Sequence, residues 1–221
     1  MKNCYIIKGI LNIVYNNEEK KMSKEDPRVK KTLNCIDDAL LKNLETTPLA
    51  KITVDTICKE ADINRSTFYK YYTDKYDLLD KYINKTIKEF SEHMMPFFID
   101  ASVKEIEEPE YRDYLKKALG FLQSKRDAYV ILWSAGMERD VYDEMIEAEA
   151  NNIFERMSDT IDETSDKYLF LKLFARTFPN NLLMCVKWWF EHDEQVSLDE
   201  FTKLIDDITK DGVFRVFRRL V

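Results

Sequence analysis

The chain has 221 residues, of which 45% are hydrophobic, and it contains only 4 Gly and 5 Pro, a composition that favours an all-helical protein with one large or two modest domains. It contains no run of about 18 apolar residues, which excludes a membrane-spanning helix. The net charge of −7 argues against binding to nucleic acid through an overall basic field.

The cysteines and histidines are few, and their spacing is not that of a metal or catalytic site. Four cysteines are scattered without paired spacing, and the histidines are His93 and His192. We also find no Gly-rich phosphate loop and no nucleophile motif. We therefore expect no enzyme activity, no metal and no cofactor. Scattered cysteines also indicate a reducing compartment, so we expect a cytoplasmic protein.

Residues 1–21 do not fit a folded domain or a targeting signal. They contain an apolar stretch that is interrupted by polar residues, and no small-residue cleavage site follows it. The sequence that follows Met22 is typical of the beginning of a protein, and the codons for Glu18-Glu19 can form a ribosome-binding sequence just upstream of it. We hypothesise that this extra segment is not translated in the cell.

The first predicted helix begins at Asp26, which suits an N-cap, and Pro27, which suits the first helical position. Apolar residues then recur every three or four positions and predict one buried face: Val29, Leu33, Ile36, Leu40 and Leu44. We expect this helix to cover the segment that follows Pro48.

The segment from Ile52 to Leu79 predicts two short helices joined by a tight turn, followed by the start of a long helix. Thr53 suits the N-cap of the first short helix, and Asp55 places a negative charge in its first turn. The turn falls at Asp62-Ile63-Asn64, because Asp and Asn tolerate the left-handed backbone better than most other residues.

The second short helix, about Asn64–Tyr72, has two different faces. Phe68 and Tyr72 form an apolar face that can pack on the rest of the domain. The opposite face carries a guanidinium, hydroxyls, a phenol and an ammonium, which are the groups that contact base edges and phosphates in a major groove: Arg65, Ser66, Thr67, Tyr69 and Lys70. The alternative is a plain helical bundle in which these tyrosines belong to the core.

This segment resembles the helix-turn-helix of the TetR family of bacterial transcriptional regulators. The family pattern is Thr-Val-x-x-Ile-x-x-x-Ala-Gly-Val-Ser-x-x-Thr-Phe-Tyr-x-x-Phe-x-x-Lys-x-x-Leu-Leu. The residues in register are Thr53, Val54, Ile57, Ala61, Thr67, Phe68, Tyr69, Lys75, Leu78 and Leu79. The chain departs from the pattern at Asp62, Asn64 and Tyr72, where glycine, serine and phenylalanine are usual. Tyr72 therefore carries a hydroxyl that must reach solvent or a partner.

The resemblance implies a role for each polar residue of the motif. Phosphate contacts are expected from Thr53, Tyr69 and Lys75. Base edges are expected to lie at or near Asn64, Arg65, Ser66, Thr67 and Lys70.

The resemblance also implies an all-α, TetR-like fold. A three-helix DNA-binding head, residues 22–75 with the helix-turn-helix at about 53–72, would be joined by a long helix to an effector-binding and dimerisation bundle, residues 76–221. Residues 22–75 carry 10 Lys and Arg against 9 Asp and Glu, and residues 1–21 carry a net charge of +2. Residues from 76 onward therefore carry −10, so DNA affinity would rest on local phosphate contacts.

The remaining sequence predicts further helices. The long helix that follows Lys75 is expected to end at Pro96. The other helices are expected at about 110–122, at 128–133 behind a capping box from Ser124 to Asp127, at 142–162, at 166–192, and from a capping box formed by Ser197 and Glu200 to residue 210. Pro179 is expected to kink or break its helix near Phe178. The tail after Gly212 is apolar enough to dock back onto the protein.

Two features of this second region carry open alternatives. The last two long helices have apolar stripes that suit either a four-helix dimer interface, as the resemblance implies, or ordinary core. An aromatic set suits either a ligand pocket or core: Tyr129, Trp133, Phe170, Phe174, Phe178 and Trp188. The segment around Trp188-Trp189 resembles a TetR subgroup that includes regulators of dihydroxyacetone kinase operons.

The sequence therefore predicts a sequence-specific DNA-binding transcriptional regulator, a ligand-responsive homodimeric repressor that binds a double-stranded operator. The alternative is a co-regulator of the same fold that acts through a protein partner instead of a small-molecule effector.

Overall fold

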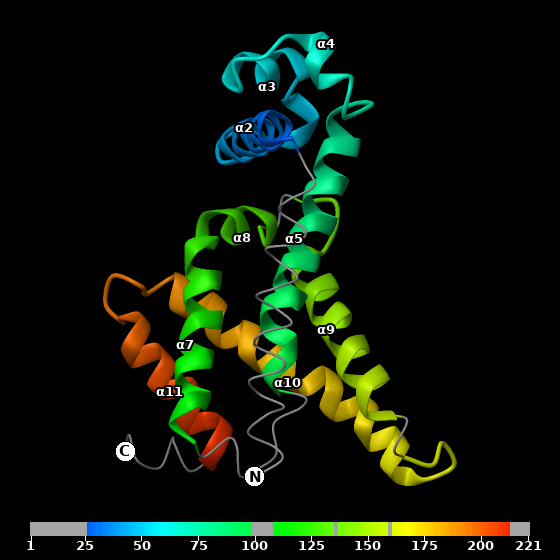
Figure 1. Cartoon of the computed structure of the whole chain (residues 1–221), viewed down its shortest axis with the longest axis vertical. Helices are drawn as coiled ribbons and strands as arrows, with labels where there is room; N and C mark the ends of the chain where they lie inside the picture. The colour runs from blue at the N-terminus through cyan, green and yellow to red at the C-terminus, as the bar shows by residue number, and fades with distance from the viewer. Residues whose placement is uncertain (1–25, 99–107, 135–136, 159–160, 213–221) are drawn as a thin grey trace. The chain divides into compact units, whose positions relative to one another are not determined.

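The computed structural model describes residues 26–98, 108–134, 137–158 and 161–212 (Figure 1). Every regular element within these ranges is a helix, which confirms the all-α prediction. None of the described helices combines the length and the hydropathy that crossing a membrane requires. The hypothesis about residues 1–21 and the docking of the tail after Gly212 fall outside the described residues.

The chain divides into two compact units, Met1–Tyr82 and Ile83–Val221, with the division inside a long helix, α5. Unit 1 contains the helices of the predicted head: α2 (Pro27–Leu44), the short 3₁₀ helix η1 (Leu49–Lys51), α3 (Val54–Glu60), α4 (Arg65–Phe68) and the start of α5 (Lys75–Phe98). Its core is formed by side chains that are fully buried: Ile36, Leu40, Ile57, Phe68 and Leu78.

The helix starts and the turn of unit 1 follow the prediction. Asp26 caps α2 by accepting a hydrogen bond from the Arg28 backbone N–H at 2.9 Å. The Thr53 hydroxyl accepts from the Thr56 N–H at 3.2 Å, and the Thr56 hydroxyl accepts from the Thr53 N–H at 3.1 Å, so α3 begins with a reciprocal capping box. Asp62 has a φ of 52°, which confirms that the turn uses the left-handed backbone.

The second helix of the motif, α4, is shorter than the predicted Asn64–Tyr72. It ends at Phe68, and the following turns close through shorter hydrogen-bonded loops, from Lys70 N–H to Thr67 O at 3.3 Å and from Tyr71 N–H to Phe68 O at 3.0 Å. The Tyr72 N–H still donates to the Phe68 carbonyl at 3.1 Å, so both aromatic residues of the predicted apolar face reach the core, with their rings 5.4 Å apart.

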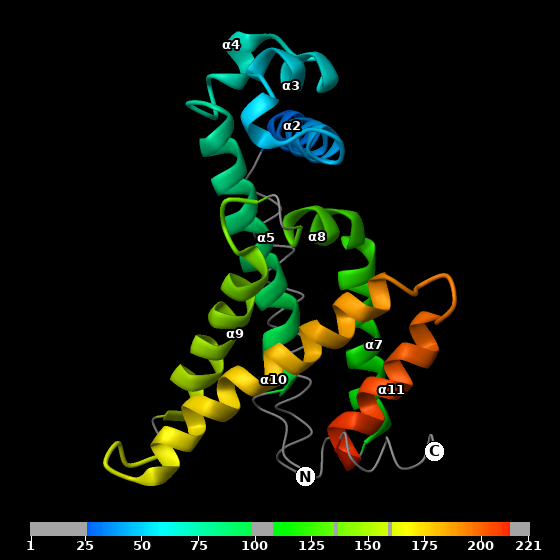
Figure 2. The same ribbon diagram turned by 180° about the vertical axis from the view of Figure 1, so that it is seen from behind.

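Unit 2 contains the rest of α5 together with α7 (Pro109–Ser124), α8 (Arg126–Leu132), α9 (Val141–Ser158), α10 (Asp166–Phe190) and α11 (Leu198–Asp211). Both views show α10 beside α9 and α11 beside α7 (Figures 1 and 2). The core between these helices is rich in large side chains that are essentially inaccessible to solvent: Tyr111, Leu115, Leu119, Met145, Leu183, Val186 and Trp189.

The apolar stripe of α11, which was expected at a dimer interface, is partly internal. Phe201 and Ile205 are buried, and the ring of Phe201 stacks on Trp189 at 4.4 Å between centroids. The buried Asp206 accepts hydrogen bonds from Arg112 Nε at 2.9 Å and Nη2 at 2.6 Å, which fastens α11 to α7. Leu204 and Ile208 of the same stripe are only partly buried, so the stripe contributes to the core of the chain through Phe201 and Ile205, and its part in a dimer interface stays a prediction.

The predicted helix boundaries in unit 2 were partly right. Ser197 and Glu200 form the expected capping box at the start of α11. Ser124 does not cap α8, because it is the last residue of α7 and its hydroxyl donates to the Phe121 carbonyl at 2.7 Å. α10 runs through the buried Pro179 without a break, so the predicted break is wrong, and a kink near Phe178 stays a prediction.

Candidate functional site

The residues predicted to contact DNA present an open polar face on unit 1. Most of their side chains are exposed: Thr53, Asn64, Arg65, Ser66, Tyr69 and Lys70. Thr67 and Lys75 are half-buried. Tyr69 exposes half of its surface, while its neighbour Phe68 is fully buried, so the two faces of the motif separate as the sequence predicts.

Arg65 is steadied by two neighbours. Its Nη1 donates to Asp55 Oδ2 at 3.5 Å, its Nε lies 3.3 Å from Asp55 Oδ1, and its Nη2 donates to the Tyr69 hydroxyl at 3.4 Å. The hydrogen bond to Tyr69 and the charge of Asp55 raise the pKa of Arg65. These bonds are long, and a guanidinium has five N–H groups, so donors are left for a base edge. The sequence had placed Asp55 only as a first-turn charge, and its contact with Arg65 was missed.

Asn64 occupies the N-cap position of α4, but its side chain makes no capping hydrogen bond. The position was therefore predicted correctly and the bond was not. The carboxamide is exposed and is not committed to the backbone of α4, which suits the predicted contact with a base.

Lys75 lies where a phosphate contact was predicted, but its ammonium is engaged inside the head. Nζ donates to the backbone carbonyls of Leu49 at 2.8 Å, Ala50 at 3.0 Å and Ile52 at 2.7 Å. An ammonium has three N–H groups, so a phosphate contact would require one of these bonds to break.

The aromatic set predicted as a ligand pocket is divided between core and surface. Tyr129 is buried and stacks on Trp133, with ring centroids 5.2 Å apart. Phe170, Phe174 and Trp188 expose about half or more of their surface, and Phe178 is half-buried. The division arises because residues of α10 alternate between the face that packs on α9 and the opposite, exposed face.

The exposed face of α10 forms a continuous line, which we call the α10 seam: Phe170, Phe174, Thr177, Asn181, Met184 and Trp188. Its members are separated alternately by four and three residues, the spacing at which one helix packs along another. Leu169 and Leu173 flank it and are also exposed. Four of its six members are large and apolar, and exposed apolar residues in such a line are typical of interaction surfaces.

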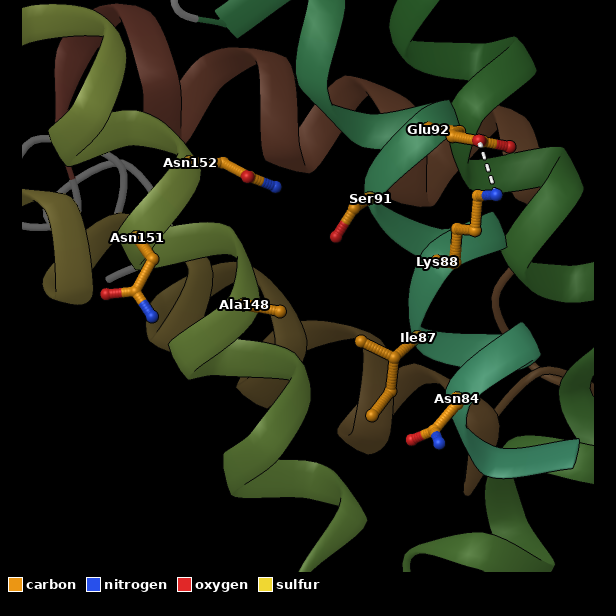
Figure 3. Close-up of a pocket in the computed structure, with 8 residues that line it drawn as sticks. All are labelled: Asn84, Ile87, Lys88, Ser91, Glu92, Ala148, Asn151 and Asn152. Atoms are coloured by element: carbon orange, nitrogen blue, oxygen red, sulfur yellow. Dashed lines mark ion pairs between the residues drawn. The ribbon is translucent and has the colours of Figure 1, made fainter. Parts of the chain in front are cut away.

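A pocket of about 460 Å³ lies between α5 and α9 (Figure 3). Asn84, Ile87, Lys88, Ser91 and Glu92 line it from α5, and Ala148, Asn151 and Asn152 line it from α9. Ile87 and Ser91 point across the gap toward Ala148 and Asn152, and Lys88 forms an ion pair of 3.9 Å with Glu92 at the edge. Three amide side chains and one hydroxyl thus lie on the opposed faces of α5 and α9, where apolar side chains would be expected to pack.

Glu149 is buried beside this pocket, with only 3% of its surface exposed. Burial raises its pKa to about 7, and the pocket residues Asn152 and Ser91, followed by the charge of Arg156, partly oppose that rise. Ser91 lies close enough to the Glu149 carboxyl to lower its pKa, but Glu149 Oε2 and Ser91 Oγ form no hydrogen bond of good geometry with any described residue. Glu149 was not singled out from the sequence. Its position on the apolar stripe formed by Met145, Ile146, Ala150 and Ile153 is the signal that predicts a buried carboxyl group.

Residues 38–82 match the family described as "Bacterial regulatory proteins, tetR family". This part of the chain, which contains α3 and α4, is therefore similar to the DNA-binding region of TetR-family regulators. The uncharacterised HTH-type transcriptional regulator YxbF of Bacillus subtilis is 33% identical over 78 residues, which are 35% of this chain and 20% of YxbF. The chain thus matches only about a fifth of the length of this curated relative.

Solved structures show that the TetR-like fold extends over both units. The fatty acid degradation regulator FadR from Bacillus halodurans has a TM-score of 0.57 at 16% identity, covering 86% of this chain and 98% of its own. FadR from Bacillus subtilis, solved in complex with stearoyl-CoA, has a TM-score of 0.55 at 18% identity, covering 81% of this chain and 98% of its own. Both of these proteins are described as regulators.

Proposed function

We propose that this protein is a sequence-specific transcriptional regulator of the TetR family that binds operator DNA as a homodimeric, ligand-responsive repressor in the cytoplasm. The observation that carries the proposal is the open polar face of α4, where Arg65, Ser66 and Tyr69 stand exposed opposite the buried Phe68. A short helix with this division suits insertion into a major groove, where short polar groups contact bases and cations contact phosphates.

A gel shift tests DNA binding directly. Purified protein is mixed with DNA from immediately upstream of its gene and with a pool of genomic fragments, at two salt concentrations. We expect a shift that weakens with salt and that the Tyr69→Ala variant loses. Absence of a shift on both DNA samples would refute DNA binding and favour the co-regulator that acts through a protein partner.

We place the dimer contact on the α10 seam. Phe170, Phe174 and Trp188 are large, exposed and in line, and a second copy of the same helix would cover them by two-fold symmetry. The apolar face of α11 is partly used within the chain, so the proposed interface rests mainly on α10. The resemblance of the segment around Trp188-Trp189 to regulators of dihydroxyacetone kinase operons stays a prediction.

We place the effector in the pocket between α5 and α9. Its volume of about 460 Å³ lies within the range of small-molecule sites. Most of the accessible surface of the pocket is apolar, and Asn84, Ser91, Asn151 and Asn152 add hydrogen-bonding groups, so we expect a small ligand that combines apolar and hydrogen-bonding groups.

The effector site can be tested with a library of small metabolites of this kind by thermal shift. A hit should stabilise the parent and release it from DNA, and Asn152→Leu should abolish both effects. Asn180→Leu, an exposed change on α10 outside the pocket, serves as the control and should keep both. Hits that act equally on both variants would place the effector elsewhere.

A further inference from the structure

Lys75 joins two segments of the head that are distant in sequence. It is the first residue of α5, and its ammonium donates to the carbonyls of Leu49, Ala50 and Ile52 at 2.8, 3.0 and 2.7 Å. The side chain is half-buried, and its Nζ lies 5.2 Å from the centre of the Tyr76 ring. All three N–H groups are therefore matched by backbone acceptors, and an aromatic ring lies beside the charge.

The three carbonyls lie at the C-terminal end of a short helix, where the Leu49 carbonyl also accepts a hydrogen bond from the Ile52 backbone N–H at 3.1 Å. The 3₁₀ helix η1 spans Leu49–Lys51, and a helix of this length leaves most of its carbonyls without intrahelical donors. These carbonyls carry the negative end of the local dipole, which a cation stabilises. Lys75 thus acts as a C-cap supplied from a different helix, through charge-assisted hydrogen bonds that are stronger than neutral ones.

What Lys75 holds lies directly beside the DNA-binding surface. Ile52, whose carbonyl forms the shortest of the three bonds, is 2% exposed and immediately precedes Thr53. Thr53 is both the N-cap of α3 and a predicted phosphate contact. A shift of the Leu49–Ile52 backbone would therefore move the start of α3.

We propose that Lys75 is a positioning residue of the DNA-binding head, which sets the place of Thr53 and α3 by holding the Leu49–Ile52 backbone, and that it does not contact a phosphate. The inference rests on the proposed DNA-binding function. In this proposal the Lys75 ammonium is an internal part of the head. Its removal therefore changes the shape of the DNA-binding surface but does not change the number of cationic groups that contact phosphates.

Two substitutions separate positioning from phosphate contact. Lys75→Arg keeps the charge, and arginine binds phosphate at least as well as lysine. A planar guanidinium, however, cannot direct three donors onto three carbonyls grouped around one point. Lys75→Met keeps the length of the side chain and removes both charge and donors. Lys70→Met, at an exposed lysine of the predicted DNA face, provides the control for a lost cation.

The experiment measures affinity by fluorescence anisotropy, on an operator that the parent protein selects from random double-stranded DNA. Salt is varied between about 50 and 200 mM, a range over which phosphate contacts change affinity strongly. Each variant is first shown by circular dichroism to be folded at the assay temperature. Positioning predicts that Lys75→Met and Lys75→Arg both bind at least about tenfold more weakly, with the parental salt slope.

Contact with a phosphate predicts the opposite pattern. Lys75→Arg would then bind as the parent does, and Lys75→Met would lower the salt slope by about 0.9. Either result would overturn the inference, as would parental affinity for both folded variants. If the parent selects no DNA, the proposed function fails, and hydrogen exchange still tests Lys75: the amides of Lys51 and Ile52 should lose protection in Lys75→Met, and unchanged protection would refute the positioning role.

Discussion

The two units of this protein expose opposite kinds of side chain. In the head the exposed face of α4 is polar, with Arg65 and Tyr69 standing over the buried Phe68. In the body the exposed face of α10 is apolar, with Phe170 and Phe174 in water, while Glu149 is buried. The difference supports the proposals that the head binds DNA and that α10 packs against a second copy of itself.

A substitution in the α10 seam should have the largest effect, because it disrupts the proposed apolar contact between two chains. Phe174→Glu places a charge in the middle of the proposed contact, so we expect a monomer whose affinity for a two-fold operator is at least about 100-fold lower, because the second head no longer binds in tandem. Light scattering and anisotropy measure the two effects. Val130→Glu, at an exposed apolar residue of α8, should remain dimeric. A dimeric Phe174→Glu variant would place the interface elsewhere.

Glu149 tests how the buried carboxyl group of unit 2 affects the stability of the protein. Its pKa in the folded state, about 7, is above its ordinary value of 4.5, so the folded protein holds this proton more tightly than the unfolded chain. The free energy of unfolding should therefore fall as the pH rises from about 5 to 7 and stay low above that. Glu149→Gln cannot ionise and should be more stable than the parent at pH 8 by on the order of 3 kcal/mol.

Urea unfolding at pH 5 and pH 8 measures this difference. The exposed Glu155 lies on the same helix, so Glu155→Gln is a matched control that should leave the pH dependence as it is in the parent. If the parent and Glu149→Gln respond equally to pH, the carboxyl does not titrate as its burial implies.

Arg65 tests whether the exposed polar face of the head contacts bases. Arg65→Ala should cost about 1–3 kcal/mol on the best operator and relax the preference at one base position, because a guanidinium that reads a base edge is lost. Binding to the operator and to a set of single-base variants measures both effects. Equal losses on every sequence would assign Arg65 to the phosphate backbone instead.

Tyr69 should give the smallest effect. Tyr69→Phe removes one hydroxyl and keeps the ring against Phe68, so binding to all sequences should weaken by roughly 0.5–1.5 kcal/mol without a change in base preference or salt slope. The same panel of operators shows this, and a sequence-dependent loss would make the phenol a base contact.

The sequence predicted the head more completely than the body, for a physical reason. The turn at Asp62 and the cap at Thr53 depend on backbone preferences and on neighbours three residues away, and both were found as expected. The contact between Asp55 and Arg65 and the bonds of Lys75 span 10 to 26 residues, and no local pattern encodes them. Local chemistry therefore gave the motif, and tertiary contacts set what its charged groups do.

In the body the same limit affects whole faces. Apolar periodicity shows that Phe201 and Phe174 each lie on a stripe, but it does not show which stripe is covered by the chain itself. Packing against α7 covers Phe201 and leaves Phe174 exposed. The pocket likewise depends on which faces of α5 and α9 oppose each other, and that pairing follows from the fold and not from either helix alone.

The adjacent tryptophans of α10 have a practical consequence. Trp189 is fully buried and donates its indole N–H to the Val196 carbonyl at 2.8 Å, whereas Trp188 is about half exposed on the α10 seam. The emission of Trp189 reports the integrity of the interior, and that of Trp188 shifts to shorter wavelength when the seam is covered. The difference spectrum between the parent and a Trp188→Phe variant therefore isolates an intrinsic optical signal, with which assembly can be followed by dilution of unlabelled protein.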